Sequence, residues 1–143
     1  MTSLSEFQKY QLITILRDLA SVDHNIDLLE AVRIRLIGLK MDLHADKIDE
    51  ALYDDLESMD SIKKRLEHFH TEEQQKFLYQ QCVLLIASNR EISPEEQSAM
   101  QELREALRLD EDFHHQIMAW CQEGIEWEKR GEMLVGMDPA QQD

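Results

Sequence analysis

Two short segments of the chain concentrate oxygen-bearing side chains that could hold a divalent cation. The first reads SVDHNIDLLE, residues 21–30, and the second reads ASNREISPEEQ, residues 87–97. Each follows an apolar run and leads into another run with helical spacing. Calcium and magnesium prefer carboxylate and amide oxygens as ligands. The candidate ligands are Asp23, Asp27, Glu30, Asn89 and Glu91.

Neither segment follows the calcium-binding pattern of an EF-hand. That loop needs oxygen ligands at positions 1, 3 and 5, glycine at position 6 and a bidentate glutamate at position 12. Counted from Asp23, the glycine position holds Leu28 and the glutamate position holds Ile34. The second segment, counted from Asn89, fails at the same two positions. The EF-hand solution is therefore excluded.

Helix capping explains part of the same segments without a metal. Ser93 precedes Pro94, and Glu96 follows three residues later, which is the pattern of a capping box. Asp27 and Glu30 have a similar spacing. We therefore predict that Ser93 and Glu96 cap one helix and that Asp27 and Glu30 cap another. Asp23, Asn89 and Glu91 have no place in the caps.

No other motif indicates catalysis. His68 and His70 are two residues apart, and on a helix such side chains diverge. The sequence contains no glycine-rich phosphate loop, no GxSxG and no HExxH. We therefore expect no enzyme, no catalytic residue and no cofactor, with at most a weakly bound divalent cation. Cys82 and Cys121 lie in apolar runs without CxxC spacing and are expected to be reduced and buried.

The charge of the chain limits its partners. Thirty acidic and fifteen basic residues among 143 give a net charge of −15. This sign repels nucleic acid and anionic lipid, and it favours cations or a basic protein surface. The longest apolar run is too short to cross a bilayer, and the first residues do not resemble a signal peptide. We expect a cytoplasmic protein without direct membrane insertion.

The elements that would position these side chains are all helical. Apolar residues recur at helical spacing in seven segments, near residues 7–20, 32–41, 48–59, 62–69, 78–86, 99–107 and 113–121. Ser3 with Glu6, and Thr71 with Gln74, offer capping boxes to the first and fifth of these segments. The prediction is one all-α domain of about seven helices over residues 1–130, followed by a loose tail over residues 131–143.

The chain also repeats itself. Residues 23–30 align with residues 89–96, and each copy then ends in a similar motif, GLKMD at 38–42 and ALRLD at 106–110. The two loops are 66 residues apart, whereas the two motifs are 68 residues apart. We therefore predict a two-residue insertion in one copy. Two such helical hairpins can pack around one core.

The stretch CVLLIASNREISPEEQSAMQELREALRLDEDF resembles the second half of TerB-like domains, which occur in tellurite-resistance proteins and beside DnaJ-like co-chaperone domains. The residues that carry the resemblance are Ala87, Ile92, Ser93, Glu95, Glu96, Leu107 and Leu109. It implies an all-helical bundle with two related halves and a cation site at the two loops. The Asp-Gly of the family pattern is Asn89-Arg90 here, which removes one negative charge and adds a positive one.

Two functions remain open at this point. The first is a non-enzymatic protein-interaction module, in a stress-response or tellurite-resistance setting, with an unidentified protein partner or a second copy. The second is an acidic divalent-cation binder. Trp127 with Met133 and Leu134 forms a candidate docking strip, and we expect it to fold back onto its own domain in preference to binding a partner. Trp120 is expected in the core.

Overall fold

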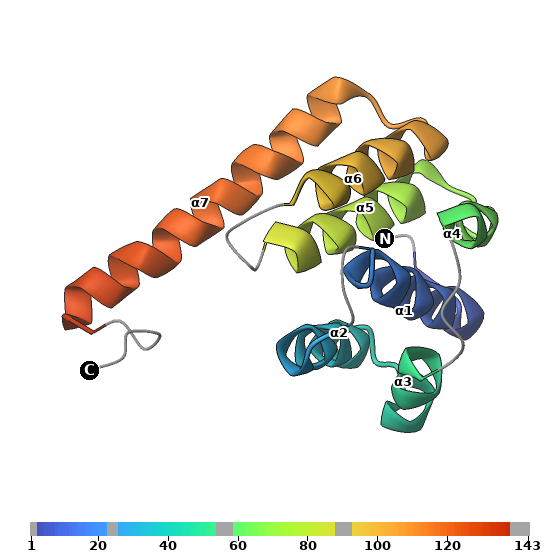
Figure 1. Ribbon diagram of the computed structural model, residues 1–143, viewed down its shortest axis with the longest axis horizontal. Coiled ribbons are helices and arrows are strands. Elements are labelled where there is room, and N and C mark those ends of the chain that lie inside the picture. The colour runs from blue at the N-terminus through green and yellow to red at the C-terminus, as the bar shows by residue number, and fades with distance from the viewer. Residues whose placement is uncertain (1–2, 23–25, 54–58, 88–92, 138–143) are drawn as a thin grey trace.

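The computed structural model describes residues 3–22, 26–53, 59–87 and 93–137. Over these ranges it contains seven α-helices and no strand, which confirms the all-α prediction (Figure 1). The helices are α1 (Glu6–Ala20), α2 (Leu28–Lys40), α3 (Ala45–Leu52), α4 (Met59–Leu66), α5 (Glu72–Ala87), α6 (Pro94–Ala106) and α7 (Glu111–Val135). Among them, none is both long and apolar enough to cross a membrane.

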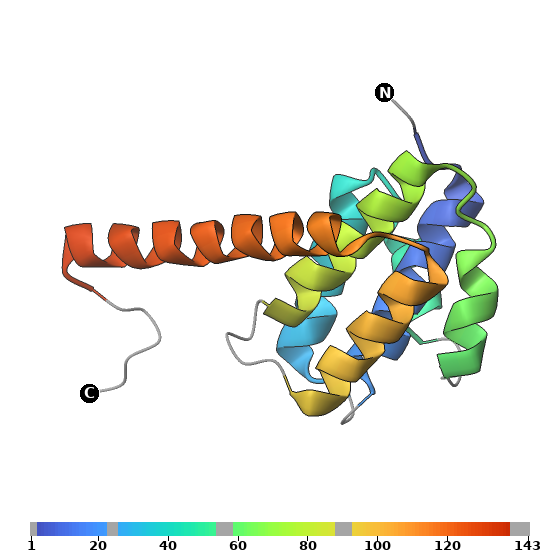
Figure 2. The ribbon, with the colours of Figure 1, turned by 90° about the horizontal axis from the view of Figure 1, so that it is seen from above.

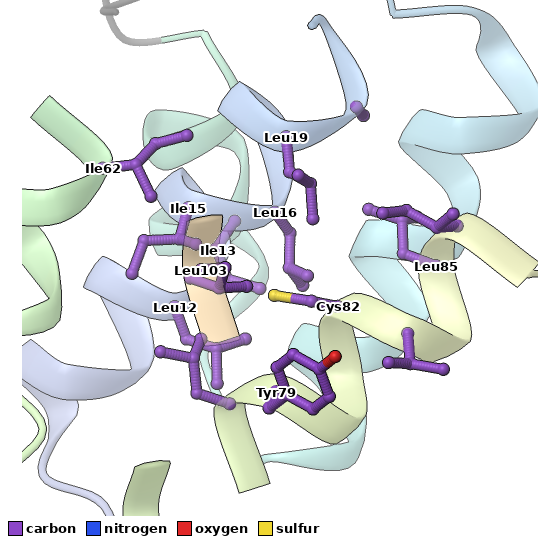
Figure 3. Packing of buried hydrophobic residues seen from close by; sticks show 14 of the residues in the cluster. Leu12, Ile13, Ile15, Leu16, Leu19, Ile62, Tyr79, Cys82, Leu85 and Leu103 are labelled. Carbon is purple, nitrogen blue, oxygen red and sulfur yellow. The ribbon is translucent and has the colours of Figure 1, made fainter. Parts of the chain in front are cut away.

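Helix α1 lies at the centre of the bundle and packs against α2, α3, α4 and α5. Every residue from Leu12 to Ala20 is buried, so the helix has no solvent-facing side over this length. Figure 3 shows Leu16 of α1 beside Cys82 of α5, within the main apolar cluster. A helix that is surrounded in this way needs partners on all sides, and the other helices supply them.

The buried part of α1 includes a charged pair. The Nη2 atom of Arg17 lies 2.7 Å from Oδ1 of Asp18, and both side chains are inaccessible to solvent. The Nη1 atom of Arg17 donates to the carbonyl oxygen of Ala51, 2.8 Å away, near the end of α3. Nε of Arg65 on α4 lies 3.9 Å from Oδ2 of Asp18. Buried charges persist when they are paired in this way, and this pair joins three helices.

The first helix begins two residues later than the sequence predicts. Oγ of Ser5 accepts from the N–H of Gln8 at 3.1 Å, and Oε1 of Gln8 accepts from the N–H of Ser5 at 2.9 Å. The predicted box of Ser3 and Glu6 was therefore wrong. Tertiary contacts decide between the two, because buried Gln8 also donates to the carbonyl oxygen of His68 at 2.6 Å, whereas Glu6 is exposed.

The helix starts recur at a constant interval. Gln8 and Gln74, the third residues of α1 and α5, are 66 residues apart, and their side-chain amides hydrogen-bond to each other at 3.2 Å. The residues that cap the helices are separated by the same interval. The paired caps are Ser5 and Thr71, Asp27 and Ser93, and His44 and Asp110.

The ends of α2 and α6 keep this interval, so the predicted two-residue insertion is wrong. Both helices have 13 residues. The N–H of Leu43 donates to the carbonyl of Gly38, and the N–H of Leu109 donates to that of Arg104. Asp42 and Arg108 have positive φ angles of 63° and 57° at corresponding turns. The GLKMD and ALRLD strings are similar in composition but two residues out of structural register.

The third and seventh helices differ from their predicted lengths. α3 ends at Leu52, and Met59 belongs to α4. α7 passes through Gly131, where the sequence predicts a loose tail, and ends at Val135 with Gly136 in the left-handed conformation. Its second half projects beyond the bundle (Figure 2). Residues 138–143 of the predicted tail lie outside the described residues.

Candidate functional site

The predicted cation ligands are only partly covered by the structure. Asp23, Asn89 and Glu91 lie outside the described residues. The other two form the cap of α2: the N–H of Glu30 donates to Oδ1 of Asp27 at 2.8 Å, and the N–H of Asp27 donates to Oε1 of Glu30 at 3.3 Å. These two carboxylates therefore hold backbone donors at a helix start.

The second segment begins α6 in the same way. Oγ of Ser93 accepts from the N–H of Glu96 at 3.1 Å, and Oε1 of Glu96 accepts from the N–H of Ser93 at 3.1 Å, with Pro94 at the first helical position. Both Glu30 and Glu96 are buried. Over the described ranges, no group of three or more His, Cys, Asp or Glu side chains is placed to share an ion. The carboxylates of Asp27, Glu30 and Glu96 thus serve in caps.

The structure also places the two histidines of the His-x-His motif and the two cysteines. The ring of His68 packs edge-on against Phe7, with centroids 4.8 Å apart, and His70 is exposed. Cys82 and Cys121 are buried free thiols, as predicted. Burial raises the pKa of Cys82 to about 12, so at neutral pH it remains an unreactive thiol.

No protein-family model, no curated protein and no solved structure matches this chain. The resemblance to TerB-like domains therefore stays a prediction.

One polar pair was not singled out by the sequence. Oη of Tyr79 on α5 lies 2.5 Å from Nδ1 of His114 on α7. Burial raises the pKa of Tyr79 to about 12, and desolvation followed by the charge of Arg104 lowers the pKa of His114. The two residues are 35 positions apart, so only the packing of α7 on α5 brings them together. Local spacing carries no signal for such a pair.

The candidate docking strip is exposed and is not folded back onto the bundle. Trp127, Met133 and Leu134 have exposed fractions of 69%, 80% and 88%. The prediction of back-folding was therefore wrong. Trp120, expected in the core, is 44% exposed. The strip is exposed because α7 is long. Cys121 is the only buried residue of this helix, which continues for fourteen residues beyond it.

Exposed apolar side chains form a stripe along α7. Trp120, Trp127 and Leu134 are spaced by seven residues, which places them on nearly the same side of a helix. Gly124 and Gly131 lie between them on that side, and nothing lies within 4 Å of a Cβ built at either glycine. Ile117 and Cys121, which face the bundle, lie on a neighbouring side of the helix. The stripe is exposed because this part of α7 continues past its last buried residue, Cys121.

Proposed function

We propose that the protein is a non-enzymatic interaction module that binds a partner protein through the projecting half of α7. The observation that carries this proposal is the exposure of Trp127 and Leu134 on one side of α7. Figure 2 shows this end of α7 extending beyond the other helices. Large exposed apolar patches on soluble domains mark interaction surfaces. Tryptophan is also among the side chains that contribute most to protein–protein binding.

The stripe has the size that a helix-in-groove contact requires. Burial of a large apolar side chain contributes about 1.5–3 kcal/mol, so Trp120, Trp127 and Leu134 together supply several kcal/mol. A groove binds such a helix through apolar side chains that lie one and two turns apart. The two glycines between the anchors allow a partner's backbone to approach the helix closely.

Charge favours a different protein over a second copy of this chain as the partner. A second copy would bring another net charge of −15 to the interface. The projecting half carries four glutamates, at 123, 126, 128 and 132, against Lys129 and Arg130. A partner with an apolar groove and a basic rim would complement both the stripe and the acidic side chains beside it.

The proposal is tested with a double variant, Trp127→Ser with Leu134→Ser, and a control, Gln122→Ser, on the opposite side of α7. Quantitative co-purification should show one protein with the wild type and the control that is lost from the double variant. The purified partner should bind the double variant at least tenfold more weakly. Equal binding would contradict the proposal. If the wild type instead sediments as a dimer and the double variant as a monomer, the partner of the stripe is a second copy of this chain.

We propose further that the domain consists of two related halves, residues 5–52 and 71–118, in a TerB-like arrangement. Support comes from the constant interval of 66 residues between the helix starts and from the contact of Gln8 with Gln74. Equivalent residues meet in this way when they lie near a two-fold axis between two halves. Superposition of the halves in an experimental structure should align α1, α2 and α3 with α5, α6 and the start of α7. Unrelated crossing angles would contradict it.

A cytoplasmic stress-response or tellurite-resistance setting follows from the TerB-like resemblance and is part of the same proposal. Deletion of the gene in its native cell should then alter growth under tellurite or related stress. Unchanged growth under those conditions would argue against this setting, while the test of α7 would remain separate.

A further inference from the structure

A cavity lies where α5, α6 and α7 meet, apart from the projecting stripe. It has a volume of about 310 Å³. Its apolar walls come from α5, α6 and α7, and its polar groups come from α6 and α7. The apolar residues are Val83, Ile86, Met100 and Met118, and the polar ones are Gln97, Gln101, Arg104 and His114. None of the described residues that line it is acidic. A mostly apolar cavity with a few convergent polar groups is the usual form of a small-molecule site.

The corresponding position in the first half of the chain, between α2 and α3, is closely packed. Gly38 is the eleventh residue of α2, and Ile48 is the fourth residue of α3. A Cβ at Gly38 would lie only 2.7 Å from Cδ1 of Ile48, so these two helices are in close contact. The eleventh residue of α6 is Arg104, and the fourth of α7 is His114. Where one half closes with a glycine and an isoleucine, the other carries an arginine and a histidine.

Arg104 gives the cavity a positive charge. Its side chain is half-buried. Within the described part of the chain, no carboxylate forms an ion pair with it. A half-buried guanidinium is the residue best suited to pair with a carboxylate, through two parallel hydrogen bonds. The site therefore has a binding group for an anion.

His114 adds a hydrogen-bond donor of defined orientation. Its Nδ1 atom meets the hydroxyl of Tyr79, which is fully buried. We assign the phenolic O–H as the donor, because a phenol donates more strongly than an imidazole. In the neutral ring the proton then resides on Nε2, which leaves this atom as a donor. The α5–α7 contact thus fixes the tautomer.

We propose that this cavity binds a small apolar monocarboxylate, with its carboxylate at Arg104 and Nε2 of His114 and its apolar body between Met100 and Met118. Among the described residues of the lining, Arg104 is the one lysine or arginine, so a doubly charged ion such as phosphate would leave one charge without a cationic partner, which disfavours it. The net charge of −15 repels anions at long range, so binding depends on the apolar body and is of modest affinity. A ligand of roughly ten non-hydrogen atoms fits a cavity of this kind.

The test uses 4-phenylbutanoate as the probe, with its neutral amide and inorganic phosphate as comparisons. Binding is followed in the full chain by the NMR signals of ¹³C-labelled methionine methyl groups, of which Met100 and Met118 report on the cavity. The carboxylate should shift both signals and saturate at millimolar concentration. The amide should bind at least tenfold more weakly, and phosphate should leave both signals unchanged.

Two variants separate the site from general effects. Arg104→Gln should weaken carboxylate binding at least tenfold, whereas Arg130→Gln, which removes a positive charge from the projecting helix, should leave it unchanged. Met118→Phe should fill the cavity and abolish binding with Arg104 in place, which gives a second test if Arg104→Gln does not fold. No saturable shift, equal affinity for the amide, competition by phosphate, or full binding in Arg104→Gln would each overturn the proposal.

Discussion

At the scale of single residues, the two polar segments begin helices. The same geometry occurs at Asp27 with Glu30 and at Ser93 with Glu96, where each side chain holds the backbone N–H of the other residue. A helix start leaves four backbone donors without intrahelical partners, and these boxes satisfy two of them. The caps therefore account for oxygen-bearing side chains that would otherwise suggest a metal.

The cap of α6 can be measured directly. Ser93→Ala should lower the free energy of unfolding by about 1 kcal/mol, the usual cost of a lost N-cap. The control is Ser98→Ala, which replaces an exposed serine inside the same helix. Because alanine is the better helix former, that variant should be neutral or slightly stabilising. Equal urea midpoints for Ser93→Ala and the wild type, with equal slopes, would contradict the cap.

The cation prediction is tested by calorimetric titration with calcium, magnesium and zinc at physiological salt. We expect only weak binding that salt screens, because a dense acidic surface attracts divalent ions without a defined site. One saturable site of micromolar affinity that Asp23→Asn abolishes would instead make the two segments a cation site.

His114 makes stability depend on pH. Desolvation and the charge of Arg104 lower its pKa in the folded chain, whereas the unfolded histidine titrates near 6.5. As the pH falls through that value, the unfolded state binds more protons, so acidification destabilises the fold. This stabilisation is present above the unfolded pKa and is lost as the pH falls toward the lower folded pKa.

The urea midpoint should therefore fall less between pH 7.5 and 5.5 in His114→Gln than in the wild type. The control is His70→Gln, which changes an exposed histidine on another part of the chain and should keep the wild-type pH dependence. The same decrease in all three proteins would show that His114 does not contribute.

At the scale of helices, the sequence predicts much of the architecture but not its register. Periodicity and caps place the helices, because both are local signals. The choice of Ser5 over Ser3 depends on the contacts of Gln8 with distant residues, which no local pattern contains. The end of α7 has a local signal, because glycine followed by proline three residues later, as at Gly136 and Pro139, is typical of a helix stop in sequence. The predicted boundary at Gly131 lacks that following proline.

Glycines in different helices should respond in opposite ways to the same substitution. Gly38→Ala places a methyl group 2.7 Å from Cδ1 of Ile48, and overpacking of this kind costs about 1–3 kcal/mol. Gly124→Ala meets nothing within 4 Å and should gain up to about 1 kcal/mol in helix propensity. Thermal unfolding of both variants checks the pair. A stable Gly38→Ala would show that α2 and α3 can move apart.

At the scale of the whole molecule, a closed bundle carries a helix that extends beyond it. The core cluster contains no residue of α7 beyond Cys121, and none of Trp120, Trp127 and Leu134 belongs to it. Figures 1 and 2 show α7 extending beyond the other helices. The sequence pointed to Trp127, Met133 and Leu134 as a strip but not to its exposure. Whether the strip folds back or is exposed to solvent depends on the direction in which α7 leaves the bundle. That direction depends on the packing of α5 against α7.

The central claim is that the stripe on α7 contacts another protein, and site-specific photo-crosslinking in the native cell tests it most directly. A photoreactive residue at position 127 or 134 lies on the stripe, and one at position 122 or 129 lies on the opposite side of the same helix. We predict that positions 127 and 134 crosslink to one common protein with a basic surface and that positions 122 and 129 do not. Equal crosslinking from both sides, or no crosslinking from the stripe, would contradict the claim.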